Sequence, residues 1–564
     1  MERRFYLVDA QVLPEVFLKV VRAKELLASG EARSISAATR AVELSRSAFY
    51  KYKDCIFDSE NGREVITVMA TLRDETGALQ SLLAGISAAG ASIVTINQST
   101  PENGAALVAV TIRTDTMQMS PEELTEKLSR QRMVVGVRCG YNLSQNRTRG
   151  KESMAKIAIL GFGTVGSGVY EVLCHNAASV SRRAGEPVEV KYILDPKDFT
   201  GNPVEPLVVK NIDVILQDPE IQVVVETIGG TRFAYPYVKA CLESGRSVCT
   251  SNKEMVATYG AELLALAKEH GCAFLFEASV GGGTPIITPM HQCLAANVIT
   301  EVEGIVNGTT NFMLTKMVRE GLGFEDALQI AQELGYAETK DPSDDVDGRD
   351  ACRKIAILSS MVCGHQIYPQ NIPTRGIRAI TAADVASAEK LGCVIKLIAW
   401  MKLGKDGSVA AGVEPCLVPK ANQLASVDDV FNAVLVKGDM LGDVVFYGKG
   451  AGKLPTASAV VADVVDALKN GAQVHDSLFW QPADPVDGML TDPAPAAYYV
   501  RVAGIAPAVV EAIYGYGKVV DERYEGCAYF VKRADERALA EAARKVEAVG
   551  GSVKLVLKRL PEEV

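Results

Sequence analysis

Apolar positions recur along the chain with two different periods, and the changes of period outline its elements. Between residues 64 and 140, strand-type alternation and helix-type spacing follow in the order strand, helix, strand, strand, helix, strand. Residues 498–564 alternate strand and helix patterns again. Polar residues without periodicity fill 142–153, and four prolines fall in 481–496. We therefore predict two linkers that separate a large central α/β region from two small βαββαβ-type modules.

The first 60 residues have a helix-rich pattern. Glu43–Ser45 reads as a turn with a second helix from Ser47 onward, which resembles a helix-turn-helix. Lys and Arg outnumber Asp and Glu here by only one, whereas nucleic-acid-binding modules usually show a clear basic surplus. We expect this segment to serve in docking or dimerisation rather than in binding nucleic acid.

A dinucleotide-binding turn is predicted where a buried strand runs into a glycine-rich sequence. Residues 156–160 (KIAIL) lead directly into GFGTVG, and a helical pattern follows. In such a turn the first glycine permits a tight bend, the second lets the backbone approach a pyrophosphate, and the third allows close helix–strand packing. We therefore expect a Rossmann domain that binds NAD or NADP through Gly161, Phe162, Gly163, Thr164, Val165 and Gly166.

The ends of later strands supply further cofactor candidates. The second strand ends at Asp195, where a carboxylate would bind the ribose 2′-hydroxyl of NAD and repel the 2′-phosphate of NADP. Lys197 would instead attract that phosphate, so both cofactors stay open. Lys253 follows another predicted strand at the sheet edge where ligands of doubly wound sheets bind, and we expect it to contact the cofactor.

Composition narrows the class of protein. The 564 residues are 48% apolar and carry a net charge of −10, which excludes collagen-like and disordered chains and disfavours nucleic acid or anionic membranes as partners. Asp9, Glu15 and Lys19 interrupt the start, so a signal peptide is not expected. The twelve cysteines form no CxxC pair and fit a reducing, cytoplasmic location. A small-molecule substrate is therefore predicted.

One acidic stretch carries the candidate chemistry. The four aspartates at 344, 345, 347 and 350 would repel one another unless they hold a metal or an ammonium or face water, and a solvated loop is the simplest interpretation. The helix that follows favours another, because Asp350 and Lys354 lie one turn apart on one face beside apolar positions. None of the five histidines lies in these motifs. A lysine or a carboxylate is therefore expected to transfer the proton.

The segment from Ala331 to Lys354 resembles the homoserine dehydrogenase signature at each defined position. Residues 251–253, 277–283, 307–311 and 448–456 resemble the same family in the same order, and the resemblance covers about residues 154–480. It implies NAD(P)-dependent interconversion of L-homoserine and L-aspartate 4-semialdehyde, a step of threonine and methionine biosynthesis.

The resemblance also implies individual roles. Lys354 would exchange the proton with the substrate oxygen, assisted by Lys253 and Asp350, and the substrate would be bound by Glu338, Asp345, Asp350 and Lys253. Gly450, in the closing glycine loop, would join the cofactor contacts. Because neighbouring carboxylates raise the pKa of a lysine, we expect the semialdehyde-reducing direction to be favoured at neutral pH.

The loop that begins at Glu277 resembles the family's monovalent-cation site. The resemblance implies that sodium or potassium is held at Glu277, Val280, Gly282 and Thr284. A turn that simply requires glycines is the alternative interpretation.

Both small modules resemble ACT domains, which sense amino acids. In the first module the turn at 74–77 keeps its glycine but lacks the usual proline, and in the second the turn at 504–507 lacks both the Asp and the following Gly. The resemblance implies an amino-acid effector, such as threonine, with a packing or dimerisation role for the second, degraded module. A homo-oligomer, dimer or tetramer, is expected.

The predicted fold class is α/β: a Rossmann domain with an α+β substrate and dimerisation domain, flanked by βαββαβ (ACT-like) modules. The expected regions are the helical segment 1–60, the ACT-like domain 61–142, the Rossmann domain 154–300 completed by about 440–480, the substrate-binding domain 301–440, and the degraded ACT-like domain 497–564.

The sequence leaves two alternatives to this function. A semialdehyde dehydrogenase acting through a thioester on Cys352 would need a histidine partner. A ligand-controlled DNA-binding regulator would depend on residues 1–60 alone.

Overall fold

The computed structural model describes residues 154–471, 478–483, 494–522 and 526–562, and before them 65–73, 77–98, 105–113, 121–141 and scattered single positions. The chain divides into two compact units, Met1–Lys151 and Glu152–Val564. The helix-turn-helix prediction for residues 1–60 and the linker at 142–153 fall almost entirely outside the described residues.

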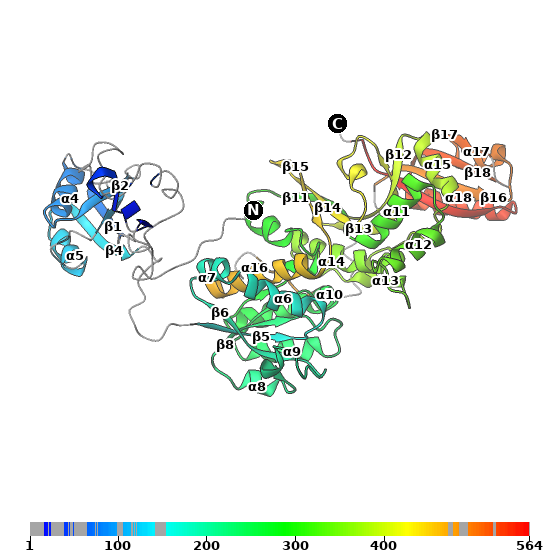
Figure 1. The fold of residues 1–564 in the computed structure, drawn as a ribbon. Coiled ribbons are helices and arrows are strands. Elements are labelled where there is room, and N and C mark those ends of the chain that lie inside the picture. The colour runs from blue at the N-terminus through cyan, green and yellow to red at the C-terminus, as the bar shows by residue number, and fades with distance from the viewer. Residues whose placement is uncertain are drawn as a thin grey trace. The chain divides into compact units, whose positions relative to one another are not determined.

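The first unit contains one four-stranded antiparallel sheet with the order β2-β3-β1-β4 (Figure 1). Leu82 and Ile86 of the first helix and Leu124 and Leu128 of the second pack in one apolar core with the strands. The predicted order strand, helix, strand, strand, helix, strand is present. Its elements are β1 (Val65–Arg73), α4 (Ala78–Ser87), β2 (Ser92–Gln98), β3 (Ala105–Arg113), α5 (Pro121–Ser129) and β4 (Val134–Tyr141).

The second unit begins with a six-stranded parallel sheet of order β10-β9-β8-β5-β6-β7. Read from β7, the first three strands reverse their chain order and the next three run outward, which is the doubly wound Rossmann arrangement. The predicted Rossmann fold is confirmed. Its elements are β5 (Ala155–Leu160), α6 (Thr164–His175), α7 (Ala177–Ala184), β6 (Val188–Leu194), β7 (Val208–Val209), α8 (Asp213–Leu216), β8 (Ile221–Glu226), α9 (Ala234–Glu243), β9 (Ser247–Thr250), α10 (Lys253–Glu269) and β10 (Phe274–Leu275).

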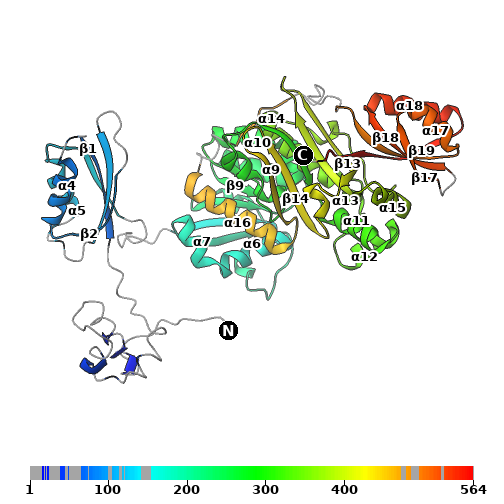
Figure 2. The ribbon, with the colours of Figure 1, turned by 90° about the horizontal axis from the view of Figure 1, so that it is seen from above.

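A late helix returns to this domain. Helix α16 (Lys453–Asn470) packs along α6 and over β8 and β9, and both ribbon views show it beside α6 (Figures 1 and 2). The two helices approach closely at Gly168, where a Cβ atom would lie 2.8 Å from the Lys453 carbonyl oxygen. Residues 453–470 therefore complete the Rossmann domain from a distant part of the chain.

The remaining elements build one mixed sheet of nine strands, ordered β15-β14-β11-β12-β13-β19-β16-β18-β17. Helices α11, α14 and α15 pack against β12, and α14 also packs against β13. The elements before the second linker are β11 (Ile299–Ile305), α11 (Gly308–Glu320), α12 (Phe324–Glu333), α13 (Ser343–Val346), α14 (Arg349–Cys363), α15 (Ala382–Lys390), β12 (Cys393–Leu403), β13 (Val409–Pro419), β14 (Phe431–Gly438) and β15 (Gly442–Lys449).

The C-terminal module shares this sheet with the preceding domain. Its last strand pairs in parallel with β13 through Cys416 opposite Lys558 and Leu417 opposite Arg559. Its strand order, β19-β16-β18-β17, matches the order β4-β1-β3-β2 of the first unit. The module comprises β16 (Ala496–Ala503), α17 (Pro507–Tyr514), β17 (Gly517–Asp521), β18 (Gly526–Ala534), α18 (Glu536–Ala548) and β19 (Ser552–Arg559).

Among the described residues, no helix has the length and apolar character needed to cross a membrane.

Candidate active site

Lys253 is presented from a rigid turn at the carboxyl edge of the parallel sheet. Asn252 caps α10 by accepting a hydrogen bond from the Met255 N–H (3.1 Å) and donates to the Gly230 carbonyl (2.6 Å). The buried carboxylate of Glu226 accepts from the Thr250 hydroxyl (2.5 Å), and that hydroxyl accepts from the Asn252 N–H. Lys253 is the first helical residue after this network, so its backbone position is fixed.

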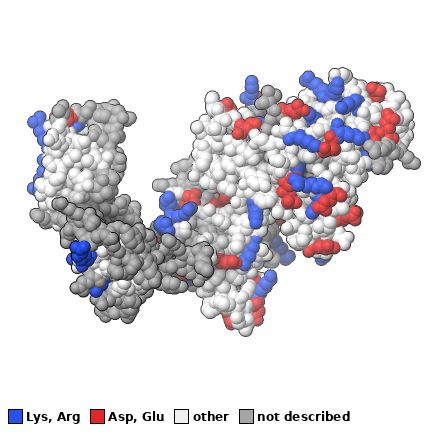
Figure 3. All heavy atoms as spheres, turned by 45° about the horizontal axis from the view of Figure 1, so that its top comes forward, with Lys and Arg blue, Asp and Glu red and all other residues white. Residues whose placement is uncertain are grey.

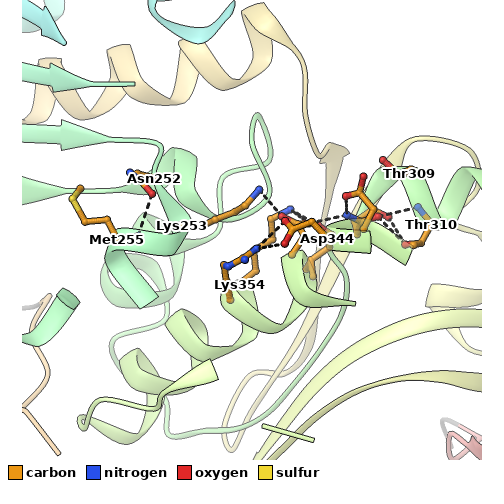
Figure 4. Close-up of polar contacts among 12 residues, drawn as sticks. Asn252, Lys253, Met255, Thr309, Thr310, Asp344 and Lys354 are labelled. Atoms are coloured by element: carbon orange, nitrogen blue, oxygen red, sulfur yellow. Dashed lines mark hydrogen bonds and ion pairs between the residues drawn. The ribbon is translucent and has the colours of Figure 1, made fainter. Parts of the chain in front are cut away.

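Lys354 meets Lys253 across one shared carboxylate. Its Nζ donates to Asp350 Oδ2 (2.8 Å) and to the Val306 carbonyl (2.6 Å), while Lys253 Nζ lies 2.6 Å from Asp350 Oδ1. Figure 4 shows the two lysines pointing toward the same group of carboxylates. The side chains of Lys354 and Asp350 are 10% and 4% exposed, whereas that of Lys253 is 37% exposed. The Rossmann helix α10 and the substrate-domain helix α14 thus meet at one charge cluster.

The other acidic side chains of the loop have separate partners. Asp344 pairs with Arg353 at 2.6 and 2.8 Å, and Asp347 accepts from Arg378 Nε at 2.6 Å. Asp345 accepts from the Asn307 amide at 2.7 Å. The described residues contain no group of three or more His, Cys, Asp or Glu side chains suited to a metal. The repulsion expected within this loop is therefore relieved by cations and an amide from neighbouring elements.

The titration behaviour of the lysines corrects one expectation. Burial lowers the pKa of Lys354, and the charge of Lys253 lowers it further, which together outweigh the opposing effect of Asp350. The pKa of Lys253 is raised, because Asp350 and the nearby aspartates outweigh its burial. The prediction that the carboxylates would leave the pKa of Lys354 raised was wrong: Asp350 and Asp345 do raise it, but burial and the second ammonium lower it more.

The pKa values of Asp350 and Asp345 shift in opposite directions. Burial would raise the pKa of Asp350, but Lys354 and Lys253 outweigh it and hold that pKa well below its usual range. Burial and the charge of Asp350 raise the pKa of Asp345 despite its hydrogen bond from Asn307. At neutral pH the cluster therefore combines an ionised Asp350 with a lysine that gives up its proton more readily than usual.

Glu338 does not join this cluster in the structure. It is exposed on the turn after α12, and the hydrogen bond found there runs from Gln332 Nε2 to its backbone carbonyl (3.0 Å). The turn is tied to the site by the Thr309 hydroxyl, which donates to the Tyr336 carbonyl (2.7 Å).

The glycine-rich loop has the geometry that a pyrophosphate requires. Gly161 has φ 89°, and a Cβ at Gly166 would overlap the Gly161 carbonyl oxygen, so both positions need glycine. A Cβ at Gly163 would meet nothing within 4 Å. No side chain caps the N-terminus of α6, whose first residue is Thr164. The loop, with Phe162 and Val165 half-buried, thus leaves helix N–H groups available to an anion.

Asp195 braces that loop. It is 5% exposed, its Oδ2 accepts from the Phe162 N–H (2.7 Å), and its Oδ1 accepts from the Lys197 N–H (2.9 Å). Lys210 Nζ donates to the carbonyls of Asp195 and Lys197. Each carboxylate oxygen can accept a second hydrogen bond, such as one from a ribose hydroxyl. Lys197, which could attract a 2′-phosphate, lies two residues after Asp195.

The carboxylate of Glu277 is held by the backbone of the loop that follows it. The Glu277 carboxylate is buried and accepts from three backbone N–H groups, those of Ile286 (2.6 Å), Ile287 (3.0 Å) and Thr288 (2.7 Å). It therefore anchors the following turn. Val280 and Thr284 are buried beside it, and a Cβ at Gly282 would overlap the Gly450 carbonyl oxygen. Backbone and hydroxyl oxygens, rather than a free carboxylate, are what this loop offers a cation.

Two side chains of the site carried no predicted role. Asn307 belongs to the stretch 307–311, which the sequence marks only by its resemblance to the family, and no motif in the sequence includes Glu226. An asparagine immediately before a helix is a signal for an N-cap, but its link to Asp345 and Asp350 depends on tertiary structure.

Cys352 does not suit thioester chemistry. It is 5% exposed, its thiol donates to the Pro369 carbonyl (3.3 Å), and burial raises its pKa. A nucleophilic cysteine needs the opposite environment.

A doubly wound domain with an open glycine loop, joined to a buried lysine–carboxylate cluster, defines an NAD(P)-dependent dehydrogenase. Two family models match the chain: "Homoserine dehydrogenase, NAD binding domain" over residues 161–277, and "Homoserine dehydrogenase" over residues 285–465. Together they cover more than half of its length. The chain belongs to the homoserine dehydrogenase family and is an oxidoreductase with an NAD(P)-binding domain.

Relatives and solved structures agree with this family. The homoserine dehydrogenase of Bacillus subtilis is 42% identical over 320 residues, which cover 56% of this chain and 73% of that relative. The Synechocystis enzyme is 44% identical with the same coverage. The crystal structure of a homoserine dehydrogenase from Thiobacillus denitrificans has a TM-score of 0.65 and 34% identity, and covers 73% of this chain and 99% of that one.

Proposed function

We propose that this dehydrogenase interconverts L-homoserine and L-aspartate 4-semialdehyde, with Lys354 exchanging the proton at the substrate oxygen. The observation that carries the proposal is the sharing of Asp350 by two lysines, one from each domain, at 2.6 and 2.8 Å. The bound nicotinamide supplies or accepts the hydride. In the reductive direction negative charge develops on the carbonyl oxygen, and an adjacent ammonium stabilises that charge and donates a proton.

The two lysines have different environments and therefore different proposed roles. Lys354 has the lowered pKa, so its neutral form is reached at lower pH, as a base for homoserine oxidation must be. Lys253 has the raised pKa and a partly exposed side chain, so it remains an ammonium facing the reacting oxygen. Asp350 orients both amines, and Asp345 is proposed to bind the substrate ammonium.

The pH dependence of homoserine oxidation should report the Lys354 amine. Because oxidation needs neutral Lys354, kcat/KM should rise with pH, with an apparent pKa below that of an ordinary lysine. Lys253→Met removes a like charge that lowers the pKa of Lys354, so the rising limb should move to higher pH. Lys253→Arg keeps the charge and should leave the limb in place. A limb that stayed fixed, or moved to lower pH, in Lys253→Met would contradict this assignment.

Sensing of an amino acid is proposed for the N-terminal module. Gly77, the N-cap residue before α4, has φ 89° and open space where its Cβ would be, as backbone approach to a ligand requires. In the C-terminal module the turn at 504–507 has Pro507 where the first module has Gly77. Its own glycine, Gly504, is not open, because a Cβ there would lie 3.2 Å from the Gly550 carbonyl oxygen, and β19 is paired with β13 of the catalytic sheet. The C-terminal module is accordingly assigned a structural role.

The effector proposal predicts a shift in thermal stability and activity. Threonine added to the full chain should raise the melting temperature and change the rate, because ligand binding stabilises the state that binds it. Gly77→Val places a branched side chain at a positive φ and should abolish the response, while Gly504→Val should not abolish it. A protein that ignored threonine, methionine, isoleucine and the aromatic amino acids would not be regulated in this way.

A monovalent cation is proposed at the loop of Glu277, Val280, Gly282 and Thr284. Carbonyl and hydroxyl oxygens are hard donors suited to sodium or potassium, and the buried glutamate balances the charge. If a cation stabilises this loop, replacing sodium and potassium in the buffer by choline should lower the melting temperature.

A homo-oligomer is proposed to form through the edge strand β15. Met440, Leu441 and Tyr447 in and beside this strand are 82%, 55% and 56% exposed, and an apolar sheet edge favours pairing. Sedimentation of the wild type and of Tyr447→Lys would test it.

A cytoplasmic location is proposed because each described cysteine is a free thiol, and thiol labelling of protein isolated under non-reducing conditions would test it.

A DNA-binding regulator is not proposed. Basic and acidic side chains are interspersed over the described part of the face in Figure 3, and residues 1–60, which suggested DNA contact, lie almost entirely outside the described residues.

A further inference from the structure

We infer that Asn307 is a positioning residue: its side-chain amide clamps Asp345 and Asp350 at a fixed separation and so holds the carboxylate that both lysines use. The inference rests on the roles proposed for Lys253 and Lys354. The side chain of Asn307 hydrogen-bonds to the carboxylates and to Thr310, and not to either lysine.

The two N–H groups of the Asn307 amide donate to the two carboxylates. Nδ2 donates to Asp345 Oδ1 at 2.7 Å and to Asp350 Oδ2 at 2.8 Å, and Asn307 is 6% exposed. A side-chain amide has two such donors, so none remains for water. The oxygen of Asp350 that Asn307 holds is also the one that accepts from Lys354 Nζ.

The other end of the amide is anchored to the backbone. Asn307 Oδ1 accepts from the Thr310 N–H (2.9 Å) and from the Thr310 hydroxyl (2.8 Å), which caps α11. Because a backbone N–H can only donate, the atom facing it must be the oxygen, and the orientation of the amide is determined. The preceding carbonyl, of Val306, accepts from Lys354. The turn between β11 and α11 therefore contacts the lysine and both carboxylates at once.

The amide of Asn307 is a donor that carries no charge. The charged groups that face the amide are Asp345 on α13 and Asp350 on α14, with Lys253 of α10 and Lys354 of α14 on the far side of Asp350. Two nearby carboxylates repel each other, and an amide bridges them without adding charge. An aspartate at position 307 would be the same size but would bring a third negative charge and lose both donors.

This difference gives a test that separates positioning from helix capping. Asn, Asp and Ser are comparable N-caps, so Asn307→Asp and Asn307→Ser should both keep the capping bond. Asn307→Ser should melt near the wild type, and Asn307→Asp at a lower temperature, because it adds a third carboxylate beside Asp345 and Asp350. Both lose the clamp. We expect kcat/KM for homoserine oxidation to fall about 100-fold in Asn307→Asp and less in Asn307→Ser. In Asn307→Asp the rising limb of the pH profile should also move to higher pH, because a further carboxylate favours the charged lysine.

Asn422→Ala is the matched control. Asn422 is likewise buried and caps a helical turn, η6 (Gln423–Ser426), through the Leu424 N–H at 2.9 Å, outside the charge cluster. This variant should melt at a lower temperature with an unchanged pH limb. Wild-type kcat/KM and pH profile in Asn307→Asp would overturn the inference, and Asn307→Ser gives the same comparison if the added charge prevents folding. Lys354→Ala, assayed alongside, keeps the two claims distinct: full activity there refutes the lysine roles, whereas full activity in Asn307→Asp refutes the clamp alone.

Discussion

Replacing Lys354 by alanine should reduce the rate of semialdehyde reduction by about two to four orders of magnitude. The variant loses the proposed proton donor and, with it, one of the two ammonium groups that stabilise the developing charge. Asp350 keeps its ion pair with Lys253 at 2.6 Å, so no buried carboxylate is left unpaired and the protein should still fold. The loss should therefore fall mainly on kcat. Steady-state oxidation of the reduced cofactor with L-aspartate 4-semialdehyde measures it.

Lys396 provides the control for the effect of removing a buried lysine. It is 2% exposed on β12, donates to Asn311 Oδ1 (3.1 Å) and pairs with Asp428 (3.2 Å), and burial lowers its pKa as it does for Lys354. Lys396→Met should lower the melting temperature while the folded enzyme keeps its kcat. If Lys354→Ala behaved like Lys396→Met, the proton-transfer role would belong to another residue.

Much of the Rossmann domain could be predicted because its signals are local. Strands buried on both faces of a parallel sheet are continuous apolar runs, and residues 156–160 were recognised in this way within β5 (Ala155–Leu160). The union of the C-terminal module with the catalytic sheet could not be predicted. It depends on Leu417 and Arg559 becoming neighbours, and such a pairing leaves no pattern in either segment.

The site divides in the same way. Asp350 and Lys354 lie one helical turn apart, so their contact follows from helix geometry. The meeting of Lys253 with Asp350 and the amide bridge of Asn307 depend on how α10, α11 and α14 pack, which spacing does not encode. The direction of the Lys354 pKa shift could not be predicted from the sequence either, because burial and the ammonium of Lys253 from another domain decide it.

Asp350→Asn should have the largest combined effect on stability and activity. The substitution removes the one negative charge that both lysines touch, and breaking a buried ion pair in this way costs about 3–5 kcal/mol. Without Asp350 the pKa of Lys354 should fall further, since that carboxylate is its main source of positive shift. The reductive rate at neutral pH, which needs protonated Lys354, should drop by about 100-fold or more.

The stability difference should itself depend on pH. The folded-state pKa of Asp350 is lowered, so its contribution is fully present above the unfolded pKa of about 3.9 and is lost as pH falls through the lower folded value. Denaturant unfolding should therefore show wild type and Asp350→Asn converging in strong acid and diverging above it. Asp384→Asn removes another buried carboxylate, paired with Arg501 at 3.0 Å, and should destabilise the fold with kcat retained. An Asp350→Asn enzyme with normal kcat would mean that the lysines are oriented by other groups.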